Sequence, residues 1–269
     1  MQKVTLYRLI VIGLLGMSCG ACMQQGPGKA APEAAQQILK LRGYEFDEKG
    51  FFAAAQARDL MAINAFFDAG INPNAQDADG RTVLISAAAR GDRQIVDVLL
   101  SRGVDLNVKD KRGYTALSHA LEAMYEDVVE ALLNQPNLDA NCRGLNGRPA
   151  LFAYVWRDSK ERVEQLLAHG ADVKLQDNDG DTALHGAAQT GNVEIIRLLL
   201  DKGADPNVKN SVGGTPLMWA AVYGNEAAAR VLLSRGADAS LTDNDGVTAA
   251  EWARRNNRDK VAALLQGKG

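Results

Sequence analysis

The chain has 269 residues, of which 30 are Lys or Arg and 33 are Asp or Glu, giving a formal net charge of −3. This mild acidity, with both signs interspersed, argues against a nucleic-acid groove, which needs a basic patch. Three cysteines are too few for a disulfide framework, and Cys142 has no obvious partner. We therefore expect Cys142 to be a half-buried free thiol.

Residues 1–18 have the layout of a secretory signal peptide. Lys3 and Arg8 precede an apolar stretch at residues 9–15, which is too short to span a bilayer, and small residues follow it. The alternative is a buried N-terminal helix, but the segment has no acidic or polar face to present to solvent. The sequence therefore predicts export from the cytoplasm.

The segment at residues 15–19 (LGMSC) resembles a bacterial lipobox, which implies that Cys19 is diacylated and becomes the mature N-terminus. Gly16 departs from the motif, which prefers Leu there, and a conventional cleavage after Ala21 is the alternative. No Asp follows Cys19, so the resemblance implies the outer membrane rather than the inner one. Residues 19–32 are polar and rich in Gly, Pro and Ala, which predicts a flexible tether.

A Thr/Pro-Xaa-Leu/Ala word recurs through the remainder of the chain. Successive words begin 33, 34, 33, 33 and 33 positions apart, and such a fixed period indicates an array of one supersecondary unit. Stacked units make an extended surface and need no catalytic pocket. The words begin at Thr82, Thr115, Pro149, Thr182, Thr215 and Thr248.

The copy at residues 179–211 shows most clearly what one unit contains. Asp179-Gly180 favours a turn, and Thr182 is positioned to cap a short, alanine-rich helix that opens at the next residue. Gly191 ends that helix. A second, Ile- and Leu-rich helix follows and stops at Gly203, before an extended loop.

Turn, helix, helix and extended loop in 33 residues resemble the ankyrin repeat, whose Gly-Ala-Asp word recurs at Gly170, Gly203 and Gly236. The resemblance covers about residues 43–265 and implies an all-α ankyrin-repeat solenoid of stacked helix pairs. We predict one domain at residues 33–269, with divergent terminal repeats and a capping helix at 33–42. About seven repeats are expected, at residues 46–78, 79–111, 112–145, 146–178, 179–211, 212–244 and 245–269.

The sequence carries no pattern of an enzyme, cofactor or metal site, such as a phosphate-binding glycine loop, paired zinc cysteines or a nucleophile elbow. The resemblance implies that His185 bridges neighbouring repeats, and His169 suits a helix C-terminus. A metal role for His119 would need partners that the sequence does not offer. The Asp-rich turn at residues 177–181 begins like a calcium loop but lacks the Glu at its twelfth position. We therefore predict a non-enzymatic protein without cofactors.

The copies at residues 112–145 and 146–178 depart most from the repeat. Met124 replaces the Gly between the helices, one residue is inserted at 135–137, and Tyr154-Val155 replace a pair of alanines. Bulky residues on a closely packed face should open this junction and change the local curvature. Either a function lies there, or the array tolerates a defect.

The resemblance implies that a partner protein binds to the turn tips and first helices, which line the concave side of such arrays. Trp, Tyr and Arg dominate interface energetics, so we searched these positions for them. Gap filling between repeats is the favoured interpretation for Phe152 and Trp252, whereas for Trp156-Arg157 and Trp219-Tyr223 it competes equally with partner contact. The candidate partner-binding residues are Arg81, Tyr114, His119, Arg148, Trp156, Arg157, Trp219 and Tyr223.

We expect a monomeric protein of the bacterial envelope that binds another protein on its concave face. By family analogy, the role is protective or immunity-type, masking a toxic or reactive partner in the periplasm. The alternative is an envelope scaffold or chaperone-like adaptor with several weak partners, while an enzyme or metal protein would need residues that we do not find. We expect no nucleic-acid binding and membrane contact only through the Cys19 anchor. The sequence does not encode the partner's identity.

Overall fold

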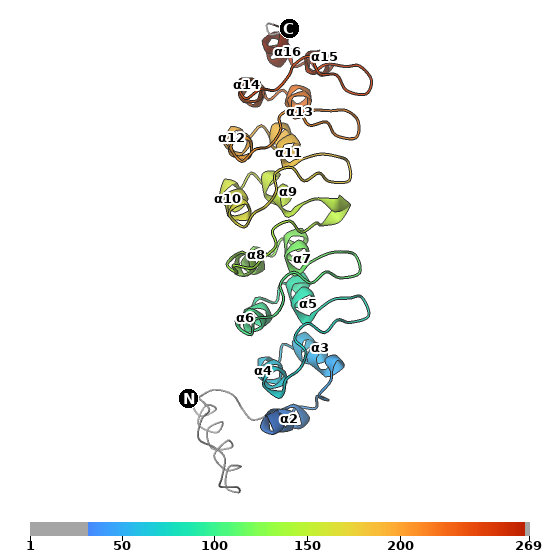
Figure 1. The fold of residues 1–269 in the computed structure, drawn as a ribbon, viewed down its shortest axis with the longest axis vertical. Helices are drawn as coiled ribbons and strands as arrows, with labels where there is room; N and C mark the ends of the chain where they lie inside the picture. The colour runs from blue at the N-terminus through green and yellow to red at the C-terminus, as the bar shows by residue number, and fades with distance from the viewer. Residues whose placement is uncertain (1–31, 267–269) are drawn as a thin grey trace.

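The computed structural model describes residues 32–266, which form fifteen α-helices with no strand beyond isolated bridges (Figure 1). The all-α solenoid prediction is confirmed. The predicted signal peptide, the Cys19 anchor and all of the tether except Pro32 lie outside the described residues. None of the described helices is long and apolar enough to cross a membrane.

The helices form two columns that run along the whole array, with the turn tips projecting beyond one of them (Figure 1). A capping helix, α2 (Pro32–Leu41), lies at the N-terminal end, as predicted. The first helices of the pairs are α3 (Glu48–Gln56), α5 (Val83–Arg90), α7 (Ala116–Ala123), α9 (Ala150–Val155), α11 (Ala183–Thr190), α13 (Pro216–Tyr223) and α15 (Ala249–Arg255). The second helices are α4 (Leu60–Ala69), α6 (Arg93–Ser101), α8 (Glu126–Leu133), α10 (Lys160–Ala168), α12 (Val193–Asp201), α14 (Glu226–Ser234) and α16 (Asp259–Gln266).

Threonine and glycine set the ends of most first helices. The Thr82 hydroxyl accepts the N–H of Ile85 at 3.2 Å, and the threonines that open α7, α13 and α15 act in the same way. Gly91, Gly191 and Gly224 end their helices with positive φ, which glycine adopts without steric cost. In copy 112–145 this position is Met124, at φ 60°, so a methionine occupies the backbone conformation that the repeat gives to glycine.

Equivalent helices of successive copies stack on each other and build one continuous apolar core. First helices pack on first helices and second helices on second helices, and the core runs from α2 to α16. Paired alanines such as Ala87 and Ala88 are fully buried and let neighbouring first helices approach closely. In copy 146–178 the larger Tyr154 and Val155 replace this pair and are also buried.

A ladder of asparagines joins the extended loops of successive copies. The side-chain oxygens of Asn74, Asn107, Asn141 and Asn207 accept the backbone N–H groups of residues 105, 139, 172 and 238, at 2.8 to 3.0 Å. Lys174 stands at the corresponding position of copy 146–178. Its side chain carries only donors, so it offers the N–H of Asp205 no acceptor. The ladder is therefore interrupted at one step among the five copies from 46 to 211.

Replacing Lys174 with asparagine should raise the free energy of unfolding by about 1 kcal/mol, because it completes the ladder with one neutral hydrogen bond. Urea titration followed by circular dichroism measures the change. Lys174→Ala is the matched control, since alanine removes the lysine without adding an acceptor. Equal stabilisation by both substitutions would contradict the ladder as the cause.

Candidate protein-binding surface

The turn tips are held by Asp or Asn side chains, whose oxygens accept backbone N–H groups of their own turn. Asp110 accepts the N–H groups of Arg112 and Tyr114, both at 2.9 Å, and the equivalent Asp77, Asp177, Asn210 and Asp243 accept the same pair of N–H groups in their copies. These acidic turns, which resemble the start of a calcium loop in sequence, are thus occupied by their own backbone. Within residues 32–266 no group of three or more His, Cys, Asp or Glu is placed to hold a metal ion.

The tip of copy 146–178 is built differently, because Gly144 stands where the other tips have Asp or Asn. At this tip the carboxylate of Glu122, which comes from α7 of the preceding copy, accepts the N–H of Leu145. The equivalent N–H groups of Lys111 and Ser211 donate to a backbone oxygen of the preceding tip. A side chain from one copy therefore completes the turn of the next. A Cβ at Gly144 would lie 2.7 Å from Glu122 Oε1, so the glycine leaves room for this link.

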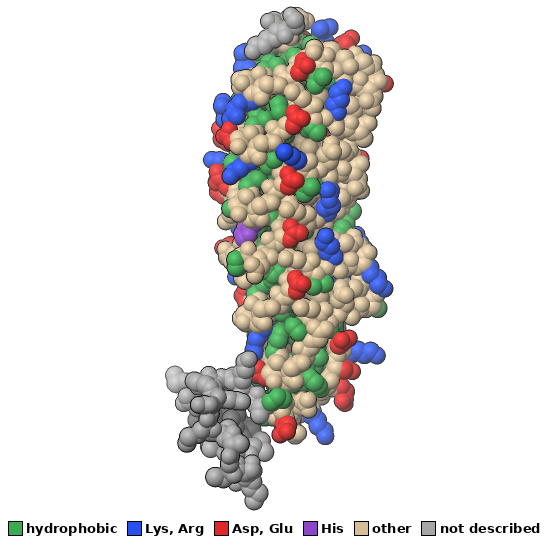
Figure 2. Space-filling view, viewed as in Figure 1, with side chains coloured by type: hydrophobic (Ala, Val, Ile, Leu, Met, Phe, Trp, Pro, Cys, Tyr) green, Lys and Arg blue, Asp and Glu red, His purple; other side chains and the backbone are tan. Residues whose placement is uncertain are grey.

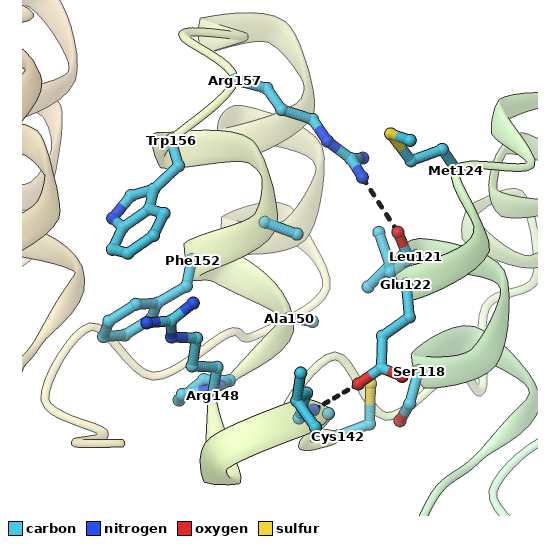
Figure 3. Close-up of a pocket in the computed structure, with 14 residues that line it drawn as sticks. Ser118, Leu121, Glu122, Met124, Cys142, Arg148, Ala150, Phe152, Trp156 and Arg157 are labelled. Carbon is cyan, nitrogen blue, oxygen red and sulfur yellow. Dashed lines mark hydrogen bonds between the residues drawn. The ribbon is translucent and has the colours of Figure 1, made fainter. Parts of the chain in front are cut away.

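A pocket of about 360 Å³ opens between α7 and α9, at the junction where the bulky substitutions led us to expect looser packing (Figure 3). Leu121 and Met124 form one wall, and Phe152 and Ala153 form the other. Its walls are mainly apolar, and the thiol of Cys142 lines it beside Ser118 (Figure 3). Helix α9 has six residues, against eight in α5, α7, α11 and α13.

The Cys142 thiol is free and buried rather than half-buried as we expected. It is buried because it lies in the core between α7 and α9, at the wall of the pocket. Burial raises the pKa of this thiol, so at neutral pH it is protonated and behaves as a small apolar side chain.

Trp156 lies at the rim of the pocket and is 45% exposed, the kind of residue that anchors a partner. The guanidinium of Arg148 stacks on its ring, 4.3 Å from the centroid. The indole also lies close to Gly186 of α11, where a Cβ would come within 2.4 Å of the indole nitrogen. Arg148 and Gly186 thus fix the position of the indole, while almost half of Trp156 remains exposed to solvent.

Arg157 has a structural role beside any role in binding. It donates to the backbone oxygen of Leu121 at 2.9 Å and pairs with Glu126 at 3.1 Å, so it ties α9 to the preceding copy (Figure 3). Tyr154 reaches the same carboxylate, donating its hydroxyl to Glu126 Oε2 at 2.8 Å. We therefore place Trp156 and Arg148 ahead of Arg157 as contacts for a partner.

An aromatic pair lies on α13, and its tryptophan, Trp219, is partly buried against the core. Trp219 and Tyr223 stack with their ring centroids 6.0 Å apart, and Tyr223 is 43% exposed. Both are also tied to copy 179–211, because Trp219 donates to Asp181 at 3.3 Å and the Tyr223 hydroxyl accepts from Gln189 at 2.9 Å. The structure thus brings this predicted pair together and gives it neighbours on the same face.

The remaining predicted residues, Arg81, Tyr114 and His119, gather around the carboxylate of Asp110. Tyr114 is only 8% exposed, since its ring lies between Arg112 and the edge of His119, and it offers little area to a partner. His119 donates its Nε2–H to the carboxylate of Asp110 at 2.9 Å. Arg81 lies 3.9 Å from the same carboxylate. Phe152 is buried and Trp252 is half-buried with its indole N–H on Asp243, in agreement with gap filling.

His185 bridges two copies, as the sequence predicts. Its Nδ1 accepts the N–H of Thr182 at 3.0 Å, so Nε2 carries the proton and donates to the backbone oxygen of Gly214 at 3.1 Å in the next copy. Burial lowers the pKa of His185, and the nearby carboxylate of Asp181 offsets this only in part.

This depressed pKa predicts a pH-dependent loss of stability. Below pH 6.5, the ordinary value for histidine, the unfolded chain binds a proton that folded His185 excludes. The free energy of unfolding should therefore fall with falling pH, approaching about 1.4 kcal/mol per pH unit. Urea unfolding at pH 7.5, 6.5 and 5.5 measures this slope in the natural protein and in His185→Gln. Identical slopes in the two proteins would contradict the assignment.

On the face drawn in Figure 2, acidic and basic side chains are interspersed along the described part of the chain, and no continuous basic stripe crosses it. Sequence reasoning missed three features of the surface. They are the hydrogen bond from Leu145 to Glu122, the stacking of Arg148 on Trp156, and the close approach of the Trp156 indole to Gly186. The absence of the tip Asp at Gly144 was the available signal for the first of these.

Stacked helix pairs with a capping helix and exposed aromatic anchors define a repeat solenoid of the class that serves as a binding scaffold. The family described as "Ankyrin repeats (3 copies)" matches residues 51–143, 136–210 and 203–269. The chain therefore belongs to the ankyrin-repeat family. Ankyrin repeats are generally protein–protein interaction modules, and their fold is typically a non-enzymatic scaffold.

Relatives of this chain include bacterial proteins. An ankyrin repeat-containing protein of Treponema pallidum (strain Nichols) is 33% identical over 146 residues, which are 54% of this chain and 49% of the relative. The chain thus spans about half the length of that curated relative. A crystal structure of an ankyrin repeat domain from Acinetobacter baumannii AYE has a TM-score of 0.61 and 30% identity, and the match covers 68% of this chain and 96% of that domain. The ankyrin repeat domain of Bcl-3, a member of the IkappaB protein family, has a TM-score of 0.65 and 28% identity, with 81% and 97% covered.

Proposed function

We propose that this protein is an exported, monomeric binding protein of the bacterial envelope, anchored in the outer membrane through Cys19. It binds one protein partner on the face formed by its first helices and turn tips. The observation that carries the proposal is Trp156, a large aromatic side chain that Arg148 and Gly186 hold at the surface beside an apolar pocket. Anchors of this kind supply most of the energy in protein interfaces.

The biological role that we propose is protective, with the array masking a toxic or reactive partner in the periplasm. Rigid docking suits such a role, because a surface that is ordered before binding loses little conformational entropy. A second candidate, an adaptor with several weaker partners, is favoured by a separate aromatic pair on α13, Trp219 and Tyr223, of which Tyr223 is 43% exposed.

Affinity capture from a detergent extract of the envelope tests the binding proposal. The full-length protein carries a C-terminal tag, and the captured proteins are quantified against it by mass spectrometry. One partner at a ratio near unity supports the specific binding protein, and many substoichiometric partners support the adaptor. Arg197→Ala on α12 is the control variant, and it should capture the same partner as the natural protein. Arg197 is exposed on the second-helix column, outside the face that is proposed to bind. Partners that bind equally well to an unrelated tagged protein would overturn both candidates.

The anchor is tested separately by the mass of the mature N-terminus. We expect a chain that begins at Cys19 and carries the added mass of a diacylglyceryl group. A chain that retains Met1, or that starts unmodified after Ala21, would overturn the lipoprotein proposal while leaving the binding proposal standing.

A further inference from the structure

Two successive turn tips, at residues 109–114 and 143–148, carry a surplus of positive charge. Four of their cationic side chains are exposed, and none of the four takes part in an ion pair within the described part of the chain. The one acidic residue of these tips, Asp110, is buried and already pairs with His119. Arg148 is left aside because it has a carboxylate partner. The four exposed cations, which we call the basic tip patch, are Lys109, Lys111, Arg112 and Arg143.

The charge of Arg143 is not needed to hold its tip together. Its guanidinium donates to the backbone oxygens of Gly147 in the same tip and Gln176 in the next, both at 2.6 Å. Gln176 is the equivalent residue one copy further on, and its uncharged amide makes the same two hydrogen bonds, to Gly180 and Lys209. An amide therefore suffices for the structure, and the positive charge at Arg143 is free to act on a ligand.

Neutral groups hold both arginines of the patch in place. Arg112 lies over the ring of Tyr114, 4.6 Å from the ring centroid, and Arg143 is fixed by its two backbone oxygens. Neither arrangement neutralises the guanidinium, because a ring and a carbonyl carry no net charge. A guanidinium that is ordered before binding loses little side-chain entropy, and its N–H groups match the two oxygens of a carboxylate. Leu145, 59% exposed in the same tip as Arg143, adds apolar surface beside these charges.

The neighbouring tips limit what can bind to the patch. The tips follow one another along one edge of the array (Figure 1). The tip before the patch carries Asp77 and Asp79, and the tip after it carries Asp177, Asp179 and Asp181. A long polyanion such as a nucleic acid, or an anionic membrane surface, would meet these carboxylates wherever it extended beyond the patch, and like charges repel. A short acidic segment of a protein can place all of its carboxylates within the two basic tips. The charge pattern therefore favours a protein segment.

We propose that the basic tip patch binds a short acidic segment of the protein partner, with the carboxylates of that segment on Lys111, Arg112 and Arg143. The inference rests on the proposed function, because the tips belong to the face that would bind the partner, and it names the chemistry of the segment. Exposed charge contacts are individually weak. The patch therefore steers and orients the partner, while the aromatic anchor Trp156 supplies more of the affinity.

The probe is a blocked pentapeptide in which a leucine is flanked on each side by an aspartate and a glutamate. It is added to the 15N-labelled full-length protein at low salt, and the backbone amide shifts are followed by NMR. A matched peptide carries asparagine and glutamine in place of the acids. We expect the acidic peptide to bind at least about fivefold more tightly than the neutral one, with the shifts concentrated at residues 109–113 and 143–147. Added salt should remove this preference, because it screens exposed charges.

One substitution removes charge from the patch while keeping the structure of the tip. Arg143→Gln should weaken binding of the acidic peptide about threefold, since a glutamine makes the same hydrogen bonds elsewhere in the array. Lys209→Gln is the matched control and should leave binding unchanged. Lys209 holds the equivalent position two copies further on, where it donates to the backbone oxygen of Thr242. Lys111→Gln, at an exposed side chain, should cause a loss similar to that of Arg143→Gln and serves as the second variant.

Equal binding of the acidic and neutral peptides, no shifts at either tip, or an equal loss with Lys209→Gln and Arg143→Gln would overturn the inference. A single-stranded DNA oligonucleotide or phosphatidylglycerol vesicles that bound the two tips as tightly as the acidic peptide would also overturn it, because the flanking carboxylates would then exclude neither. A stoichiometric partner captured from the envelope alongside any of these results would leave the proposed function intact. Binding of the acidic peptide as expected, with no captured partner, would instead place the failure on the proposed function.

Discussion

Replacing Tyr154 with alanine should lower the free energy of unfolding by about 4 kcal/mol, the usual cost of deleting a large buried aromatic side chain. The ring is 1% exposed on α9, and it takes the place of a small residue between stacked helices. Its removal leaves a cavity in the core of copy 146–178. It also removes the hydroxyl that binds Glu126 and the ring beside the guanidinium of Arg157. Urea unfolding followed by circular dichroism measures the loss.

Tyr154→Phe separates the two contributions. It keeps the ring and removes only the hydrogen bond to Glu126, so the expected loss is about 1 kcal/mol. Burial and the Glu126 carboxylate raise the pKa of the Tyr154 phenol, and the hydroxyl therefore remains a donor at neutral pH. A loss below 1 kcal/mol for Tyr154→Ala would show that the ring does not carry the packing of this copy.

The second large effect concerns binding rather than folding. Trp156→Ala should weaken capture of the envelope partner by about 2 kcal/mol, or roughly 30-fold in Kd, because exposed tryptophans with ordered surroundings are frequent hot spots. The free energy of unfolding should change by less than about 1 kcal/mol, since the side chain is half exposed. Surface plasmon resonance with the captured partner gives the Kd.

Tyr223→Ala provides the comparison for Trp156→Ala. Tyr223 lies on α13 and is 43% exposed, close to the 45% of Trp156. A loss of affinity with Tyr223→Ala and none with Trp156→Ala would move the binding surface from α9 to α13, and with it the proposed anchor.

The features that every repeat shares could be predicted from the sequence. The contacts between particular residues of neighbouring copies could not. The period, the threonine caps and the left-handed glycines follow from local chemistry that every copy shares, so the helix bounds in the structure agree with them. The bridge from His185 to Gly214 was also expected, because the resemblance carries it. Predicting these features requires no knowledge of how adjacent copies pack against each other.

Contacts between dissimilar copies could not be read in the same way. Tyr114 looked like a surface anchor in the sequence, but Arg112 and His119 enclose its ring. The Glu122 carboxylate crosses to the N–H of Leu145, and whether a flexible side chain reaches that far depends on the spacing of two helices. The sequence marked the junction as irregular through Met124 and Tyr154, yet the pocket at that junction emerges only from packing.

The asparagine ladder has a consequence for how such a chain gains or loses length. Each rung joins a side chain to a backbone group about 31 residues further on, and the His185 bridge spans 29. Excision of one whole period therefore brings each rung asparagine to a backbone group of the same kind, whereas a cut of another length keeps a rung only where a loop takes up the difference. The rung from Asn107 to the N–H of Asp139 shows such an adjustment, because it encloses the extra residue at 135–137 and spans 32 residues, yet the hydrogen bond is kept at 2.9 Å.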